Sequence, residues 1–270
     1  MRIMTCNIRY SAAKDGDDGW QFRKRFLVKT VLSRRPDIIG FQEVWEDQFA
    51  FLRKQLKGYD HYGLFMLPGA ARKDPLNVIF YKRAGFELLN ASAFYLSETP
   101  HIPASRSWDN SEYNPRHANW VLLKERSSGR EFRFMNTHLD HEGQIARENQ
   151  ARIVCENANA YPQEFPQILT GDMNCDASNA AMKIYFSNDW VDTYEAVHGT
   201  PMPGYTFHAF KGSGYEHRDR TDKDYIDKMD WILVKGAVNI SGALIVTDSR
   251  DGRYSSDHYF IIADVGVVPA

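Results

Sequence analysis

A short internal repeat limits the fold of this 270-residue chain more than any other feature. Residues 2–8 (RIMTCNI) align with residues 133–139 (RFMNTHL), and a segment with helical spacing of apolar residues follows each of them. A second strand-like run then begins after a proline, at 36–39 and again at 166–169. Chance similarity is the alternative for so short a match. If the repeat is real, the chain contains two related strand–helix–strand halves that pack sheet against sheet.

Polar side chains stand where these strand-like runs end. Asn7 and Glu43 end two runs in the first half, and His138 and Asp172 end the matching runs in the second. Because the two halves would follow the same course, all four ends should meet at one rim. Singly, each residue has an ordinary explanation, since strand ends are solvated and Asn and Asp form turns there. Together they supply atoms that bind metals and move protons.

Further polar positions extend this pattern. Asp230 opens an apolar run, Asp257 and His258 directly precede another, and Asn174 follows Asp172 by two residues. Side chains two apart on an extended backbone point the same way, which would place an acid beside an amide that can hold water or an oxyanion. Gly-Asp-x-Asn is also a common turn composition, so this pair alone is a weak signal.

Six stretches carry these residues in an order typical of a known enzyme family: 5–8 (TCNI), 41–44 (FQEV), 136–139 (NTHL), 170–174 (TGDMN), 229–232 (MDWI) and 256–258 (SDH). In this combination the chain resembles the exonuclease–endonuclease–phosphatase superfamily, which includes deoxyribonucleases, AP endonucleases, sphingomyelinases, inositol polyphosphate phosphatases and nocturnin-type enzymes. The resemblance covers the chain from end to end. It implies an α/β fold of the deoxyribonuclease I type, a four-layer α/β/β/α sandwich. Two packed, mainly antiparallel sheets would be flanked by helices, with the site on the rim between them.

The resemblance also implies a metal site. Glu43 would be the principal Mg²⁺ ligand, with Asn7 beside it and Asp257 near or on the metal, and Mn²⁺ is the alternative ion. A hard dication prefers oxygen ligands, with few protein carboxylates and with phosphate oxygens and waters in its other positions. The chemistry of these three side chains agrees with that preference.

The resemblance implies roles for the polar groups around the metal as well. Asp172 would orient or deprotonate the attacking water, and Asn174 would hold the water or the developing charge. His258 would donate to a phosphate oxygen while Asp230 fixes its tautomer. His138 stands where relatives carry a His or Tyr that contacts phosphate.

Asp224 is a second candidate for the aspartate that begins a strand and pairs with His258. The apolar run 231–234 follows Asp230, whereas Asp224 leads into charged residues. Asp230 is therefore the preferred assignment.

Four side chains are predicted to contact the substrate, because loops decide the substrate in such scaffolds. Arg106 and Trp108 lie in the irregular segment 97–115, and Arg116 follows it. Arg116 suits bidentate phosphate binding, with a surface ion pair as the alternative. Trp108 would stack on a base or sugar, or else pin the loop. His208 lies in an aromatic segment that could line the cleft from the other side.

Composition narrows the partners and the compartment. Lys and Arg number 33 against 35 Asp and Glu, a net charge of −2, so no global basic field favours nucleic acid, although a local basic patch stays open. Three distant cysteines form no metal, redox or disulfide pattern, and the chain starts directly in a strand-like run without a signal peptide. We expect a cytoplasmic protein without a membrane span; a secreted protein with its signal removed is the alternative. Residues 1–270 contain no linker and are predicted to form a single domain, with a monomer favoured.

These observations predict a Mg²⁺-dependent hydrolase of phosphate esters. It would cleave a phosphodiester or a phosphomonoester, such as a nucleotide or a small organic phosphate, by direct attack of an activated water. A DNA or RNA nuclease with a locally basic rim is the alternative enzyme. A non-catalytic phosphate-binding scaffold is the third hypothesis, which the complete set of six stretches disfavours.

Overall fold

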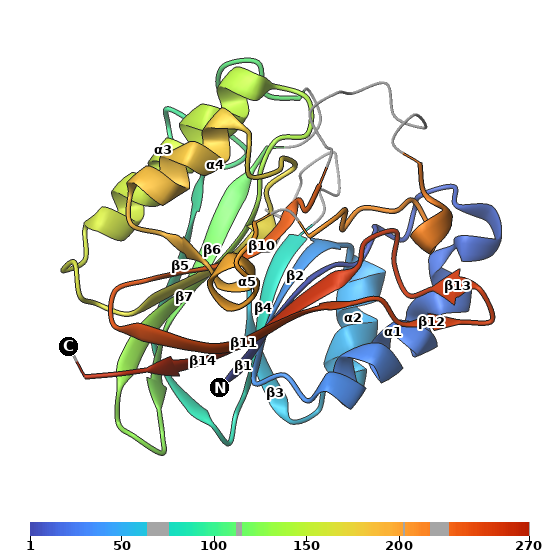
Figure 1. The fold of residues 1–270 in the computed structure, drawn as a ribbon, viewed down its shortest axis with the longest axis horizontal. Coiled ribbons are helices and arrows are strands. Elements are labelled where there is room, and N and C mark those ends of the chain that lie inside the picture. The colour runs from blue at the N-terminus through green and yellow to red at the C-terminus, as the bar shows by residue number, and fades with distance from the viewer. Residues whose placement is uncertain (64–75, 112–114, 202, 217–226, 270) are drawn as a thin grey trace.

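Two six-stranded sheets form the centre of the molecule in this computed structural model, which describes residues 1–63, 76–111, 115–201, 203–216 and 227–269 (Figure 1). The first sheet has the order β11-β14-β1-β2-β4-β3 and the second the order β5-β6-β7-β8-β10-β9. The strands of the first sheet are β1 (Arg2–Asn7), β2 (Ile38–Val44), β3 (Tyr59–Tyr62), β4 (Leu76–Lys82), β11 (Val238–Val246) and β14 (Phe260–Val267). Those of the second are β5 (Phe86–Tyr95), β6 (His117–Glu125), β7 (Glu131–His138), β8 (Gln167–Asp172), β9 (Val191–Asp192) and β10 (Asp230–Lys235).

Helices cover the outer face of each sheet. In Figure 1, α1 (Trp20–Arg34) and α2 (Glu46–Gln55) lie over the first sheet, and α3 (Gln144–Asn159) and α4 (Ala180–Ser187) lie over the second. The smaller elements are η1 (Gly16–Asp18), α5 (Thr193–His198), η2 (Gly212–Gly214) and the hairpin of β12 (Ser249–Arg250) and β13 (Arg253–Tyr254). The predicted four-layer sandwich of the deoxyribonuclease I type is therefore confirmed.

The internal repeat corresponds to a structural repeat. In the first sheet β1 and β2 pair in parallel and are joined by α1; in the second sheet β7 and β8 pair in parallel and are joined by α3. In the described residues, the other neighbouring strands of both sheets pair antiparallel. The two parallel pairs bring the ends of β1, β2, β7 and β8 to one side of the sandwich.

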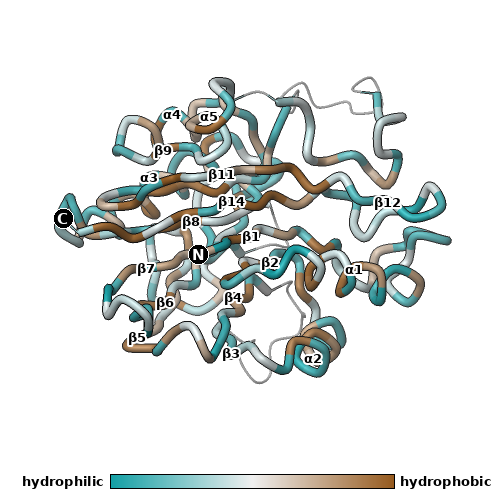
Figure 2. Tube along the Cα trace, turned by 60° about the horizontal axis from the view of Figure 1, so that its bottom comes forward, coloured by the Kyte–Doolittle hydropathy of each residue, from teal (hydrophilic) through white to brown (hydrophobic). Residues whose placement is uncertain are grey.

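Alternation along the strands produces three apolar cores. On β1, Ile3 belongs to the core between the sheets, whereas its neighbour Met4 belongs to the core beneath α1 and α2. On β8, Ile168 likewise faces the first sheet, whereas Leu169 packs beneath α3 and α4. Figure 2 shows hydrophobic residues along much of β11 and β14, and on β14 Ile261, Ala263 and Val265 belong to the core between the sheets. None of the helices in the described residues has the length and apolar character needed to span a membrane.

Two details of the sequence prediction were wrong. Residues 86–89 alone have a sequence typical of a strand and predict its end at Leu89, but β5 continues past a bulge to Tyr95. Asn174 was placed on an extended backbone in line with Asp172, but β8 ends at Asp172 and Asn174 adopts a left-handed conformation with φ 50°. The sequence of residues 59–67 also predicts a strand; β3 covers Tyr59–Tyr62, and residues 64–67 lie outside the described part of the chain.

Gly40 on β2 lies between the sheets, where there is no room for a side chain. A Cβ atom at this position would lie 2.1 Å from Thr170 Oγ1 and 2.6 Å from Asn136 Oδ1. Both side chains are fully buried and bonded to each other at 3.1 Å, so neither can move without losing that bond. We expect Gly40→Ala to lower the free energy of unfolding by about 1–3 kcal/mol. Urea denaturation measures this against Gly266→Ala, whose Cβ would meet nothing within 4 Å. Equal stability of the two variants would contradict the expectation.

Candidate active site

The ends of four strands meet in one hydrogen-bonded cluster at the rim. Asn7 Nδ2, at the end of β1, donates to Glu43 Oε1 at 3.1 Å and to Asp172 Oδ2 at 2.9 Å. His138 Nε2, at the end of β7, lies 3.5 Å from the same Asp172 oxygen. Residues 165 positions apart in the chain are therefore in direct contact. The arrangement is the one that the repeat predicted.

Strand alternation explains why three of these side chains point between the sheets. Asn7 follows Ile3 and Thr5 on the inner face of β1, and Asp172 follows Ile168 on the inner face of β8. Glu43 breaks this rule. Alternation would turn it towards α2 together with Phe41, but the register shifts at this end of β2 and Glu43 has φ 60°. The left-handed backbone instead directs its carboxylate towards Asn7, and such strain in a residue with a Cβ often marks a functional position.

Asp230 and His258 form a second pair beside Asp172. His258 Nδ1 lies 2.8 Å from Asp230 Oδ2, and His258 Nε2 lies 3.8 Å from Asp172 Oδ2. Burial by itself would lower the pKa of His258, but the carboxylates, with Asp230 first, raise it to about 10. The ring therefore carries a proton on both nitrogens at neutral pH, and Asp230 holds one of them.

The Asp172 carboxylate is buried at the centre of the cluster. Burial first, and then the charge of Asp230, raise its pKa to about 7, against the opposing effects of His258 and of the hydrogen bonds from Asn174 and Asn7. A carboxylate with a pKa near neutrality can take a proton from water in its normal working range. This property distinguishes Asp172 from an ordinary solvated aspartate.

Asn174 meets Asp172 through a tight turn. Its backbone N–H donates to Asp172 Oδ1 at 2.9 Å, and its side-chain Nδ2 donates to Leu139 O at 3.0 Å and to His138 Nε2 at 2.8 Å. His138 Nε2 must then accept, so its proton is on Nδ1. Burial, followed by the charge of Arg116, holds the pKa of His138 well below its usual range. His138 is therefore a neutral ring beside the charged His258.

The residues fit a bound cation. Among the described residues, the buried Asp230 Oδ1 has no hydrogen-bond donor. Asp172, Asp230 and His258 offer ligand atoms within 4.8 Å of one another. His258 Nδ1 and Asp230 Oδ2 are already bonded to each other, however, and are less free to bind a metal. We therefore favour the Glu43 side of the cluster for a metal.

The Glu43 side offers the carboxylate oxygens of Glu43 and Asp257, each of which has a neighbouring donor. Glu43 Oε2 accepts from the Tyr10 backbone N–H at 3.1 Å, and Ser256 Oγ lies 3.1 Å from Asp257 Oδ1. Asn7 differs from the prediction: its Oδ1 accepts from the Arg9 backbone N–H at 3.0 Å, which leaves Nδ2 facing the carboxylates. In this orientation Asn7 positions Glu43 and Asp172 as a donor, and its amide would have to turn over to ligate a metal.

The predicted substrate contacts lie in different environments. Arg116 is 8% exposed and bonded through Nη2 to His141 Nδ1 at 3.1 Å, with Asp140 Oδ2 at 3.8 Å from Nε. Arg106 and Trp108 are exposed in the loop, where their contacts with a substrate stay predictions.

The structure does not support the predicted contact of His208 with the substrate. The ring has no exposed surface and packs against Tyr254 and Tyr259, with ring centroids 4.6 and 4.1 Å away. It supports the segment behind His258 and cannot touch a substrate directly. Asp224, the alternative to Asp230, lies outside the described residues.

Two residues that support the site, Arg9 and Thr206, were not predicted from the sequence. Arg9 Nε lies 3.6 Å from Asp257 Oδ2, while its guanidinium holds both oxygens of Asp15 at 3.2 and 3.0 Å. Thr206 Oγ1 accepts the backbone N–H of Asp230 at 3.2 Å and so fixes the start of β10. Arg9 stands two residues after Asn7, and this spacing could have indicated that it lies near the site. The sequence around Thr206 contains no such indication.

His117, at the start of β6, predicts a pH dependence of stability. Burial, followed by the charge of Arg116, lowers the pKa of His117 to about 4. Between pH 4 and 6.5 the unfolded chain binds a proton here that the folded chain does not, so stability falls as the pH falls. Because of His117, the free energy of unfolding should fall by about 2 kcal/mol between pH 7 and pH 5. Denaturation of His117→Gln at both values should show a correspondingly smaller loss, and the exposed control His101→Gln should match the wild type. If His117→Gln loses as much stability between pH 7 and pH 5 as the wild type does, His117 is not the cause of the pH dependence.

Comparison with known proteins places this geometry in context. The family model described as the Endonuclease/Exonuclease/phosphatase family matches residues 4–258. Nocturnin of Drosophila melanogaster is 30% identical over 317 residues, which cover 100% of this chain and 47% of that protein. The chain thus spans about half the length of this curated relative.

Solved structures show the same fold. A mannosyl-6-phosphatase of Bacteroides thetaiotaomicron superposes with a TM-score of 0.84 at 27% identity, covering 98% of this chain and 99% of that one. The human nocturnin catalytic domain with a bound sulfate anion superposes with a TM-score of 0.72 at 23% identity, covering 99% of this chain and 93% of that one.

Proposed function

Since the chain belongs to the Endonuclease/Exonuclease/phosphatase family, we propose that it is a divalent-metal-dependent hydrolase of phosphate esters. In the proposed reaction the oxygen of a water forms a new bond to phosphorus while the bond from phosphorus to the ester oxygen breaks. The water loses a proton and the departing alcohol gains one. No covalent bond to the protein is formed.

The buried Asp172 carboxylate carries this proposal. Its pKa of about 7 suits it to accept the proton of the water, and the hydrogen bonds from Asn7 and from the Asn174 backbone fix its position. His258, charged and held by Asp230, would donate from Nε2 to a phosphate oxygen. The neutral His138 and the Asn174 amide would line the other side of the phosphate.

Glu43 and Asp257 would hold the metal, with Asn7 keeping Glu43 in place. When bound, a hard divalent cation supplies positive charge that offsets the charge developing on the phosphate and the leaving oxygen. Mg²⁺ is proposed because carboxylate oxygens and a phosphate suit it, and Mn²⁺ has the same ligand preference.

A small phosphate ester is favoured over nucleic acid. Two arginines close to the site are paired with neighbouring groups: Arg9 with Asp15, and Arg116 with His141. A nuclease would instead need cations spread along the path of the phosphate backbone. The similarity to a mannosyl-6-phosphatase supports a small ester as well.

Hydrolysis of p-nitrophenyl phosphate and bis-p-nitrophenyl phosphate tests the proposal, with Mg²⁺, Mn²⁺ or EDTA. We expect release of p-nitrophenol that requires the metal, and the preferred ester will distinguish a phosphatase from a diesterase. Release that EDTA leaves unchanged would refute metal dependence. A duplex DNA substrate cleaved faster than both esters, with strong salt sensitivity, would instead favour the nuclease.

A further inference from the structure

Gln42, the residue before the proposed metal ligand, is a fully buried amide on β2 that bonds to the second sheet. Its Nε2 donates to Asn136 Oδ1 on β7 at 2.7 Å, to Thr5 Oγ1 on β1 at 3.1 Å and to Gly40 O at 3.2 Å. In return, Asn136 Nδ2 donates to Phe41 O of β2 at 2.8 Å. Buried amides with so many partners are held in one orientation. This pair therefore connects the two sheets at a fixed position.

The backbone of β2 contains one extra residue at the same point. Phe41 pairs with Val78 of β4 and Val44 pairs with Leu76, so three steps along β2 correspond to two steps along β4. Phe41 and Val44 both belong to the core beneath α1 and α2, although residues three apart on a regular strand face opposite ways. The irregularity is a β-bulge, a feature that redirects side chains beside active sites.

Glu43 takes the extra position because both of its neighbours are fixed. Gln42 is held on the inner face by its amide bonds, and Val44 is fully buried on the outer face. The backbone of Glu43 accommodates the change of face, and its φ of 60° is a strained conformation for a residue with a Cβ. Such a conformation persists only where the surrounding contacts determine it.

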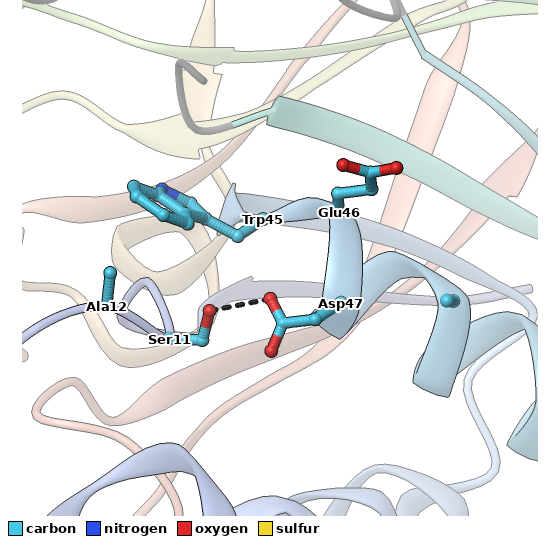
Figure 3. Close-up of a pocket in the computed structure, with 6 residues that line it drawn as sticks. Ser11, Ala12, Trp45, Glu46 and Asp47 are labelled. Carbon is cyan, nitrogen blue, oxygen red and sulfur yellow. Dashed lines mark hydrogen bonds between the residues drawn. The ribbon is translucent and has the colours of Figure 1, made fainter. Parts of the chain in front are cut away.

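The chain after the bulge is fixed at the start of α2, beside the pocket drawn in Figure 3. Ser11 Oγ, from the loop after β1, donates to Asp47 Oδ1 at 2.6 Å, the bond marked in Figure 3. Gln48 Oε1 accepts the backbone N–H groups of Trp45 and Ser11 at 2.9 and 3.1 Å. These bonds lie within the first sheet and its helix. The connection of the bulge to the second sheet therefore comes from Gln42 and its partner on β7.

We propose that Gln42 is a positioning residue that fixes the bulge and so directs the Glu43 carboxylate to Asn7 and to the metal. The inference rests on the proposed function for the role of the metal, but its first consequence is structural and requires no metal. Without the amide of Gln42, the bulge can relax and Glu43 can follow the alternation of the strand, which turns it towards α2. Gln42 is fully buried and cannot touch a substrate, so it acts through Glu43.

Gln42→Met tests the proposal, because methionine is close to glutamine in length and volume and lacks the amide. Gln167→Met is the matched control. Gln167 is also fully buried, its Nε2 donates to Ala158 O at 2.9 Å, and it lies at the opposite end of β8 from Asp172. In the part of the chain that the structure describes, neither Gln42 Oε1 nor Gln167 Oε1 has a hydrogen-bond partner. The two substitutions therefore remove similar buried groups.

Crystal structures of the two variants without metal give the first readout. We expect Gln42→Met to lose the bond of 3.1 Å between Asn7 Nδ2 and Glu43 Oε1, with the Glu43 backbone out of the left-handed region. Gln167→Met should keep both features. An unchanged Glu43 in Gln42→Met would overturn the proposal, whatever the protein hydrolyses.

Titration calorimetry with Mn²⁺ gives the second readout. We expect Gln42→Met to weaken Mn²⁺ binding by about tenfold, and Gln167→Met to stay within about twofold of the wild type. In the Glu43→Gln background, Gln42→Met should weaken binding no further, because its effect passes through the Glu43 carboxylate. Equal weakening in both backgrounds would overturn the proposal, since Gln42 would then act through another group or through stability alone.

Thr5→Val is the variant to use if Gln42→Met does not fold. It removes one acceptor of the Gln42 amide and leaves the bond to Asn136, so it should weaken Mn²⁺ binding in the same direction by a smaller factor. An affinity equal to that of the wild type would then overturn the proposal.

Failure of the proposed function would give a different result: a wild type that binds Mn²⁺ and hydrolyses no ester, with both effects of Gln42→Met intact. That result would leave Gln42 as the residue that positions Glu43. A wild type that binds no Mn²⁺ would overturn the role of Gln42 in metal binding, and the crystal structures would decide its role in directing Glu43.

Discussion

Replacing Asp172 with asparagine is expected to lower kcat for the hydrolysis of p-nitrophenyl esters by about 10²–10⁴-fold. The asparagine keeps the size of the side chain and an oxygen for the Asn174 backbone N–H, a bond of 2.9 Å in the wild type. It cannot take a proton from water, and its NH₂ group would face the donor Nδ2 of Asn7. The loss should appear in kcat at saturating metal, because the proton acceptor and not the metal ligand has been removed.

Asp176→Asn is the matched control for this variant. Asp176 is a buried carboxylate in the same loop, where it accepts from the backbone N–H and the hydroxyl of Ser178 at 2.9 and 2.6 Å. Its replacement should cost stability through the turn and leave kcat within a few fold of the wild type. Activity of Asp172→Asn within tenfold of the wild type would show that another group accepts the proton.

Replacing Glu43 with glutamine is expected to weaken Mn²⁺ binding by about 10–100-fold or more, measured by titration calorimetry or by the electron paramagnetic resonance signal of free Mn²⁺. The Glu43 carboxylate accepts from Asn7 Nδ2 and from the Tyr10 backbone N–H, and the amide of glutamine removes its charge without changing the volume. Hydrolysis should fall in parallel, and added metal should restore part of it. Glu87→Gln, exposed on β5, should bind Mn²⁺ as the wild type does.

The variant His258→Gln decides between the two positions that could hold a metal. If the metal lies at Glu43, His258→Gln keeps its Mn²⁺ affinity and loses activity. If the metal instead lies among Asp172, Asp230 and His258, whose ligand atoms are within 4.8 Å of one another, His258→Gln loses Mn²⁺ and Glu43→Gln keeps it. The second result would contradict the assignment made here.

Much of the fold was readable in the sequence because it depends on local patterns. The alternation of apolar residues in 2–8 and 133–139 predicted strands, and the helical spacing between each strand and the next predicted two related halves. The order of the six stretches identified the family, which the family model over residues 4–258 confirms. The polar residues at the strand ends could be chosen as candidates for the same reason.

Tertiary structure alone decided how those candidates are used. Alternation places Glu43 on the wrong face of β2, and only a left-handed backbone at a shifted register turns it towards Asn7. The amide orientation of Asn7 is set by the Arg9 backbone, and His208 is buried by rings more than 40 residues later in the chain. Local sequence specifies the period of each strand, whereas these choices follow from backbone angles and long-range contacts that form only when the two sheets pack together.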